Sequence, residues 1–577
     1  MVNGKVRLLI LLFCSGTVLS ALFTNCSEGG FSASDPGNTS GFTAGIGSEG
    51  DPLTAYAWHI NNTGQKVFAA AGGKVGNDLN LAQTWTDGVY GQGVKILISD
   101  DGVEDNHEDL SGNFNYNYLS KDYTLASPYT SNRAAPKTAD DSHGTAVAGL
   151  IAGMAGNGKG ARGVAPKAQI VSSNFLAENV SQTAAIVADQ VRGSLDIYNM
   201  SWGGAQNLLS TPIPGFETQV RFGITNGRSG KGSIYVKAAG NEFFVNCRNS
   251  SSAECVGNSN FDAENASPFF IVVGALNAKG TAASYSSGGS NLWVSSFGGE
   301  FGTDTPAMFT TDRMGCSVGF AKSTSTSTIT FEKGQNGNTG CNYTAIFNGT
   351  SSAAPVMSGA VALMLSVNPN LTWRDVKYIL AKTATQVDFV TTGSITHPHA
   401  TSGVTLPTGY VWEQVWVRNA AGFYFQNWYG FGRVNVDAAV SMARNFVSPL
   451  KALTESNWAN STTLSSAIPD NSATGVTSTM AVADNMQIEG VQLRVWATHT
   501  DISELALELT SPSGTKSIIV NARNAMVGLA NYQGETLLSN AFYQESSAGN
   551  WTLRVVDAKS GNSGTLTRWS LNFIGGK

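Results

Sequence analysis

The spacing of apolar residues changes once along this chain of 577 residues, near residue 448, and the change separates two fold classes. Upstream, short apolar runs alternate with segments of helical composition, such as the one that opens at His143 and the one from Ser351 to about Val367. The runs lie at 94–98, 196–200, 233–236 and 270–273. Because buried strands that alternate with helices form parallel sheets, residues 51–447 are predicted to be an α/β domain with helices on both sheet faces.

Downstream of residue 448, apolar and polar residues alternate with period two. The runs at 491–495, 504–509 and 551–555 show this pattern, and turn sequences such as Ser511-Pro512-Ser513-Gly514 separate them. Short alternating strands with little helix predict an antiparallel, jelly-roll-like β-sandwich over residues 448–577. The stretch 387–428, rich in Thr, Gly and aromatic residues, is interpreted as an insertion in the first domain.

The N-terminus has the order of an export signal. Lys5 and Arg7 precede an apolar run that is too short and too interrupted to be a stable membrane span. Residues 1–25 are therefore predicted to be a signal peptide, and the Gly/Ser-rich residues 26–50 a flexible linker. The protein is expected to be secreted or held in the cell envelope. In the second case Cys26 would accept a lipid anchor.

Charge and cysteine content narrow the function classes. The formal net charge of -6 argues against nucleic acid as a partner. Four cysteines beyond the N-terminal segment make an even set suited to an oxidising compartment. Local pairing of Cys247 with Cys255, and of Cys316 with Cys341, is the simplest of their three connectivities, and the sequence leaves all three open.

Chemically active side chains lie at the ends of predicted elements. Asp100 follows the strand 94–98, His143 opens a helix, and Ser351 opens another within a run of small residues. Because strand C-termini and the following helix N-termini share one edge of a parallel sheet, the three side chains are expected to meet there. Asn241 and the segment Ser201-Trp202-Gly203 follow two further strands.

These residue types suit nucleophilic acyl transfer. A serine hydroxyl becomes nucleophilic when an imidazole removes its proton, and a buried carboxylate fixes the imidazole tautomer and stabilises its protonated form. The amide of Asn241 could donate to the oxyanion, and the segment 201–203 could pair with an extended substrate backbone. The sequence order Asp, His, Ser is the one that subtilisin uses.

At this point the sequence resembles the kexin/furin branch of the subtilase family, with a proprotein-convertase P domain at its end. Outside the motifs above, the resemblance rests on Asp51-Pro52-Leu53, Trp58-His59, Asn368 to Val376, Tyr429 to Gly432, Leu509 to Thr515 and Gly549 to Leu553. It implies an exported serine endopeptidase with a subtilisin-like fold. The catalytic roles would fall on Asp100, His143 and Ser351, with Asn241 at the oxyanion.

The resemblance also implies cleavage of proteins or peptides after single basic or dibasic sites. Asp262 matches an acid at the base of the family's first substrate pocket, and Asp101 and Asp140 match acids of the second. Charge complementarity would select arginine or lysine before the scissile bond.

Calcium is implied as a cofactor. Asp51, Asp109 and Asn157 match positions of the family's tight Ca²⁺ site, and oxygen ligands of this kind suit a hard cation. A second calcium site of the family is expected to be missing, because Gln206 stands where its first acid would be.

Family members usually carry a propeptide that assists folding, whereas only linker-like residues lie here between the signal and Asp51. A separate folding chaperone is therefore a hypothesis, and the mature protein is expected to be a monomer. Two alternatives to a basic-specific protease are a secreted protease of broad specificity and, less favoured, a catalytically silent binding or adhesion protein.

Overall fold

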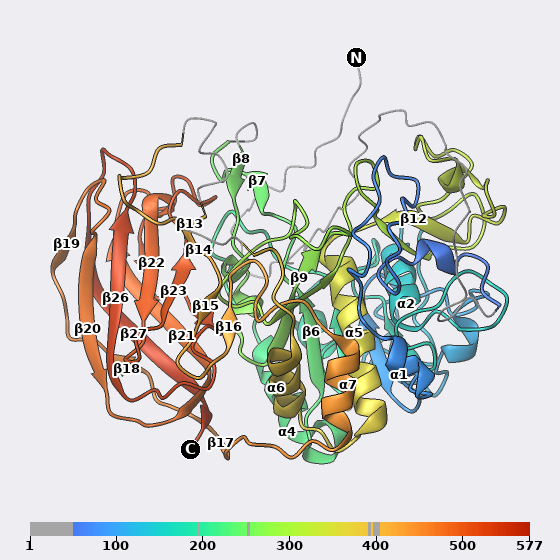
Figure 1. Cartoon of the computed structure of the whole chain (residues 1–577), viewed down its shortest axis with the longest axis horizontal. Coiled ribbons are helices and arrows are strands. Elements are labelled where there is room, and N and C mark those ends of the chain that lie inside the picture. The colour runs from blue at the N-terminus through green and yellow to red at the C-terminus, as the bar shows by residue number, and fades with distance from the viewer. Residues whose placement is uncertain (1–49, 194, 251–253, 390–393, 396–403) are drawn as a thin grey trace.

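The computed structural model describes residues 50–577 except 194, 251–253, 390–393 and 396–403. The expected signal peptide, Cys26 and all but the last residue of the predicted linker lie outside the described residues. An α/β unit and a β-sandwich stand side by side in Figure 1, and both predicted fold classes are confirmed.

The α/β unit is built on one sheet with the strand order β10-β9-β6-β5-β1-β4-β2-β3. Every neighbouring pair is parallel except β2 and β3 at the edge. In this order the strands are Val294–Phe297, Phe270–Leu276, Ile234–Ala238, Ile197–Met200, Lys95–Ser99, Gln169–Ser173, Ser120–Lys121 and Thr130–Ser131. The central strands are almost continuously buried, because helices cover both of their faces.

Alternate residues of the sheet show which helix lies on which face. Tyr198 and Tyr235 stack with ring centroids 4.8 Å apart, and they face α4 (Phe216–Gly230), where Gly223 leaves room for the Tyr235 hydroxyl. The next residue, Asn199, points to the opposite face and accepts a 2.8 Å hydrogen bond from Ser358 of α5 (Thr350–Val367). Helix α2 (His143–Ala152) contacts α5 on that face.

The remaining helices of this unit are α1 (Ala82–Thr86), α3 (Ala184–Asp189), α6 (Trp373–Thr383) and α7 (Val436–Arg444). Helix α6 begins with a capping box between Thr372 and Asp375. Within the described part of the chain, α5 is long and apolar enough to cross a membrane, but it is buried in the core.

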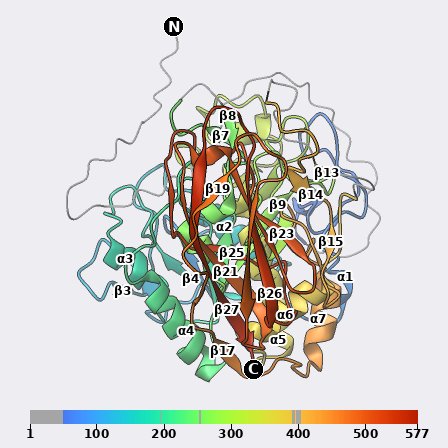
Figure 2. The same cartoon turned by 90° about the vertical axis from the view of Figure 1, so that its left-hand side faces the viewer.

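The sandwich consists of two antiparallel sheets, which Figure 2 shows nearest the viewer. One sheet has the order β17-β27-β21-β24, with β18 and β19 also on β27 and β25 on β21; the other has the order β20-β26-β22-β23. In chain order, β17 to β27 are Leu453–Glu455, Ala459–Asn460, Ser466–Ile468, Val476–Val482, Gln487–Thr498, Leu505–Thr510, Lys516–Val520, Tyr532–Gln533, Leu537–Ser539, Gly549–Asp557 and Gly564–Gly576. The predicted domain boundary after residue 447 falls between α7 and β17.

The stretch interpreted as an insertion in the first domain lies against the sandwich. Its described parts include β14 (Glu413–Gln414), β15 (Val417–Arg418) and β16 (Tyr424–Phe425), and β13 (Ser394–Ile395) pairs with β14. The Trp412 indole donates to Ala522 O at 2.8 Å, and the Asn419 amide donates to Ala541 O and Tyr543 O. This segment therefore joins the two units, because its side chains satisfy backbone carbonyls of the sandwich.

Candidate active site

The three side chains predicted to meet at the sheet edge are held by three different elements. Asp100 directly follows β1, His143 is the first residue of α2, and Ser351 is the second residue of α5. His143 Nδ1 lies 2.9 Å from Asp100 Oδ1 and 3.0 Å from Oδ2. The Asp100 carboxylate also accepts the Asp101 N–H at 2.9 Å and is fully buried, so its orientation is fixed.

The electrostatics of this pair favour an imidazole that can accept a proton. Burial by itself would lower the pKa of His143, but the Asp100 carboxylate outweighs burial and raises it above 6.5. The other ring nitrogen, Nε2, is buried and has no hydrogen-bond partner among the described residues. Since Nδ1–H donates to Asp100, Nε2 is the nitrogen available to take a proton.

Ser351 is held by the end of β5. Its Oγ donates to Ser201 O at 3.1 Å, and Ser201 Oγ donates to Ser351 O at 3.0 Å. Gly349, at the N-cap of α5, has a φ of +97°, a conformation that residues with a Cβ rarely adopt. The glycine permits the sharp turn from β12 into the helix that carries Ser351.

Asn241 lies beside the first turn of α5. Its Oδ1 accepts hydrogen bonds from Thr350 N at 2.7 Å and from Thr350 Oγ1 at 2.9 Å. Its Nδ2 is buried without a partner in the described part of the chain. The amide is therefore oriented with a free donor, which suits stabilisation of a developing oxyanion.

A hairpin that the sequence did not reveal connects His143 and Ser351. Strand β11 (Met308–Thr311) pairs with β12 (Tyr343–Phe347), and β12 leads directly to α5. On the other side, Thr311 Oγ1 donates to Thr145 O at 2.7 Å and Thr310 Oγ1 to Ala146 O at 2.6 Å, in the first turn of α2. The same hairpin thus contacts the helix that begins at His143 and leads into the helix that carries Ser351.

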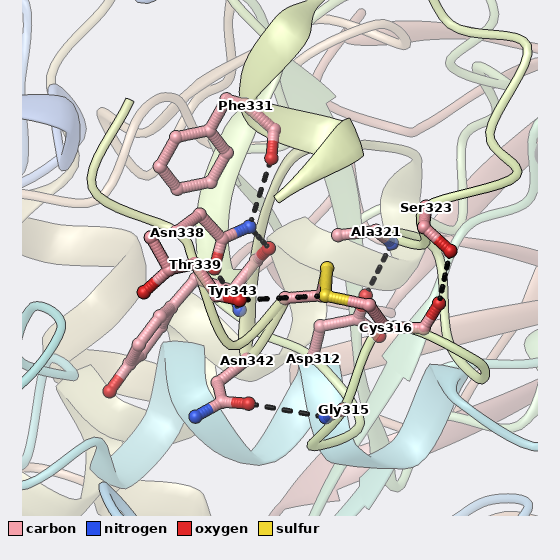
Figure 3. The surroundings of a disulfide bond; sticks show 11 residues. Asp312, Gly315, Cys316, Ala321, Ser323, Phe331, Asn338, Thr339, Asn342 and Tyr343 are labelled. Carbon is pink, nitrogen blue, oxygen red and sulfur yellow. Dashed lines mark hydrogen bonds between the residues drawn. A yellow bond between two sulfur atoms is a disulfide. The ribbon is translucent and has the colours of Figure 1, made fainter. Parts of the chain in front are cut away.

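The connection between these two strands is closed by the Cys316–Cys341 disulfide, whose surroundings are drawn in Figure 3. Asp312 accepts the Ala321 N–H at 2.6 Å, and Asn338 donates to Tyr343 O at 2.7 Å. From the same connection, Arg313 Nη1 donates to Thr138 O at 3.0 Å and to Asp141 O at 2.9 Å, just before His143. The connection therefore supports the loop from which α2 begins.

The second disulfide, Cys247–Cys255, closes the hairpin of β7 (Phe244–Asn246) and β8 (Glu254–Val256) soon after Asn241. The two disulfides make up the simplest of the three connectivities.

The predicted substrate-pocket acids have different surroundings. Both Asp101 oxygens accept backbone N–H groups of α2, from His143 at 2.9 Å and Gly144 at 2.7 Å, so this carboxylate caps the helix. Asp140 is exposed. Asp262 is only 1% exposed and forms an ion pair with Lys237, 2.8 Å from Nζ to Oδ2.

The three predicted metal ligands are brought together at the opposite end of α2. Asp51 Oδ1 accepts the Asn157 N–H at 3.1 Å, and Asn157 Nδ2 donates to Asp109 Oδ1 at 2.8 Å. Asp109 Oδ2 is buried and accepts no hydrogen bond from the described residues. Burial, followed by the Asp51 charge, raises the pKa of Asp109 to about 8. An unsatisfied carboxylate oxygen beside a second carboxylate fits a bound cation, although Arg162 already pairs with Asp51 at 2.8 Å.

Three residues that contact the candidate site or its supporting loops were missed by sequence reasoning: Lys237, Glu242 and Arg313. Lys237 had a visible signal, because it interrupts the apolar strand Ile234–Ala238, and a lysine inside a buried strand requires a partner. Glu242 and Arg313 had no visible signal in the sequence, since neither lies in a periodic pattern or a known motif.

Comparison with known proteins identifies two matching families. Residues 91–432 match the subtilase family, and residues 488–573 match the proprotein convertase P-domain. The extracellular serine protease of Aeromonas sobria is 36% identical over 550 residues, which cover 89% of this chain and 85% of the relative. A dibasic-processing endoprotease of Schizosaccharomyces pombe is 27% identical over 544 residues, 91% of this chain and 65% of the relative.

Among solved structures, the fold is similar to that of the Aeromonas sobria serine protease in complex with its chaperone. The TM-score is 0.83 at 32% sequence identity, with 92% of this chain and 95% of the other covered.

Proposed function

Since the chain belongs to the subtilase family and is a serine endopeptidase with a P domain behind its subtilisin-like domain, we propose that Asp100, His143 and Ser351 form its catalytic triad. The observation that carries this proposal is the Asp100–His143 hydrogen bond, which leaves His143 Nε2 free at the sheet edge where α5 begins.

In this mechanism Ser351 Oγ attacks the carbonyl carbon of the scissile peptide bond while His143 Nε2 takes its proton. The Ser351 hydroxyl hydrogen turns from Ser201 O to His143 as substrate binds. Asn241 Nδ2 and the Ser351 N–H donate to the oxyanion of the tetrahedral intermediate. His143 then donates the proton to the leaving amine, and water hydrolyses the acyl-enzyme by the same steps.

The proposed substrates are proteins or peptides with a basic residue before the scissile bond. Ser201, Trp202 and Gly203 would pair with the extended substrate backbone. Support for a basic preference comes from Asp262 and Glu242, which accept hydrogen bonds from Gly204 and Gln206 just after this segment, and from the dibasic-processing relative in Schizosaccharomyces pombe. The alternative is a broad extracellular protease, favoured by the internal pairing of Asp262. Profiling a peptide library distinguishes the two, because a broad enzyme would show no enrichment of arginine or lysine before the cut.

Calcium is the proposed ion for the site of Asp51, Asp109 and Asn157. When bound, it would neutralise the two carboxylates and stabilise the fold. Asn157 would have to turn its amide, because Nδ2 faces Asp109 while Oδ1 accepts the Lys159 N–H. Calcium at a hundredfold its Kd would add about 2.7 kcal/mol to the free energy of unfolding.

We expect chelation of calcium to lower the melting temperature of the wild type and to leave that of Asp109→Asn nearly unchanged. Equal shifts in both proteins would contradict the site.

Export and chaperone-assisted folding are proposed from the relatives. The Aeromonas sobria protease is named extracellular, and its solved complex contains a chaperone. Mass determination of the protein recovered from culture medium would test removal of residues 1–25 and detect a lipid on Cys26. Full activity of the chain expressed alone would remove the need for a chaperone.

Covalent labelling by a fluorophosphonate tests the catalytic proposal directly. Wild-type protein should be labelled, Ser351→Ala should not, and Ser352→Ala is the matched control that should retain labelling. Ser352 is the next residue of the same helix and is equally buried, so the pair separates a nucleophile from a structural serine. A folded, calcium-loaded wild type that is not labelled would favour the binding or adhesion function instead.

A further inference from the structure

Asp262, the acid expected at the base of the first substrate pocket, has all of its charge satisfied inside the protein. Oδ2 accepts Lys237 Nζ at 2.8 Å and the Gly204 N–H at 3.0 Å, and Oδ1 accepts the Glu264 N–H at 3.1 Å. Gly204 directly follows the segment 201–203 proposed to bind substrate, so Asp262 contacts the chain at the end of that segment. The carboxylate is close to the substrate path but is not directed to it.

Lys237 is the reason that the Asp262 carboxylate is not directed to the substrate. It is 0% exposed next to the C-terminal end of β6, and its Nζ also lies 5.2 Å from the centroid of the Trp202 ring. A fully buried ammonium is strongly stabilised by a carboxylate partner, because an uncompensated charge in the interior costs several kcal/mol. Burial alone would raise the pKa of Asp262, but Lys237 outweighs burial and lowers it, so the carboxylate stays ionised and paired.

The neighbouring acid Glu264 adds no charge to this cluster at neutral pH. Its Oε1 accepts the Ile213 N–H at 2.7 Å, and burial, followed by the Asp262 charge, raises the pKa of Glu264 to about 8. Protonated Glu264 together with the Lys237–Asp262 pair has no net charge. The cluster beside Gly204 thus offers no net negative charge to a basic side chain.

Glu242 stands in a different position. It follows Asn241, and its half-buried side chain reaches back to the loop after Ser201–Gly203, where Oε2 accepts the Gln206 N–H. The same Gln206 donates its side-chain amide to Ala239 O at 2.7 Å, which holds the two loops together. Glu242 Oε1 accepts no hydrogen bond from any residue that the structure describes. Burial, followed by Asp262, raises the pKa of Glu242 to about 7, so a nearby cation would stabilise its ionised form.

We propose that Lys237 is a built-in counter-ion that withdraws Asp262 from substrate recognition and leaves Glu242 as the carboxylate that meets a basic side chain before the scissile bond. This inference rests on the proposed protease function and on its basic preference. It makes Lys237 and Glu242 the residues that determine specificity at the first pocket.

The test compares kcat/KM for two peptide substrates that differ only in arginine or methionine before the cut. Glu242→Gln should lower the arginine-to-methionine ratio at least about tenfold, as expected for a lost charge pair of about 1.4 kcal/mol. The double variant Lys237→Met/Asp262→Asn removes the internal pair without leaving a buried charge, and it should leave the ratio within about twofold of wild type. Glu300→Gln, which changes a half-buried glutamate bound to Ser284, is the matched control.

A lowered ratio in the double variant, or an unchanged ratio in Glu242→Gln, would overturn the inference. Lys237→Met alone should raise the ratio, because Asp262 would then need the substrate cation as its partner. If this variant fails to fold, the double variant and Glu242→Gln still decide whether Glu242 or Asp262 meets the basic side chain.

A wild type that cleaves both peptides equally well would refute the basic preference itself and with it the role of Glu242. A wild type that cleaves neither and is not labelled by fluorophosphonate would refute the protease function.

Discussion

Two buried carboxylates, Asp100 in the α/β unit and Glu508 in the sandwich, have partners of different chemistry. In the α/β unit, Asp100 is paired with a histidine, a group that changes charge near neutral pH. In the sandwich, Glu508 lies 2.8 Å from both Lys516 and Arg554, and Glu504 lies 2.6 Å from Lys559, groups that keep their charge. The Asp100 pair can move a proton, whereas Glu508 links β22 to β23 and β26. Replacing these acids one at a time should therefore separate catalysis from stability.

Replacing Asp100 should have the largest effect on hydrolysis. Asp100→Asn keeps the shape of the side chain but favours the wrong imidazole tautomer, so kcat should fall about 10⁴-fold with little change in melting temperature. Steady-state kinetics together with calorimetry would check both values. A loss of kcat that matches a loss of folded protein would show that Asp100 is structural.

The second-largest effect on hydrolysis is expected from removing the free side-chain amide of Asn241. Asn241→Ala should lower kcat about 10² to 10³-fold with little change in KM, because the donor acts on the transition state and not on bound substrate. Asn241→Asp is a second variant of the same size without the donor and should lose as much. An effect mainly on KM would instead place Asn241 in ground-state substrate binding.

The pH dependence should reveal the raised pKa of His143. Catalysis needs neutral His143, whose pKa is raised by Asp100. As the pH is lowered, kcat/KM should therefore begin to fall while the pH is still above 6.5, and it should then fall about tenfold per pH unit. Asp100→Asn should move this limb to lower pH, since the larger of the two carboxylate effects that oppose burial of His143 is then lost and only that of Asp101 remains. A limb that stays at the same pH in the variant would assign it to another group.

The acid of the sandwich should have the smallest effect on hydrolysis. Glu508→Gln removes the negative charge that pairs with Lys516 and Arg554, and since both are partly exposed, the free energy of unfolding should fall by only about 2 kcal/mol. kcat/KM at a temperature where the variant remains folded should equal that of wild type. A loss of activity in the folded variant would show that the sandwich contributes to the active site.

Much of the active site could be predicted because each candidate lies at the end of an element whose apolar pattern is local. The strand before Asp100 and the helices that begin at His143 and next to Ser351 appear within one residue of their predicted positions. The hairpin of β11 and β12 could not be predicted, since its strands are separated by a disulfide-closed connection and neither shows a clear period. The segment 404–428 was also difficult, because it contacts the sandwich through long-range hydrogen bonds such as Trp412 to Ala522.

The sequence by itself determined the two fold classes, the order of the three reactive side chains and their position at one sheet edge, because apolar periodicity and parallel-strand geometry act locally. Only the tertiary structure decided what each acid does. Asp101 caps α2, Asp262 pairs with Lys237, and Glu242 accepts the Gln206 N–H. The charge state and availability of a carboxylate depend on the donors and cations that folding brings to it, and those come from distant parts of the chain.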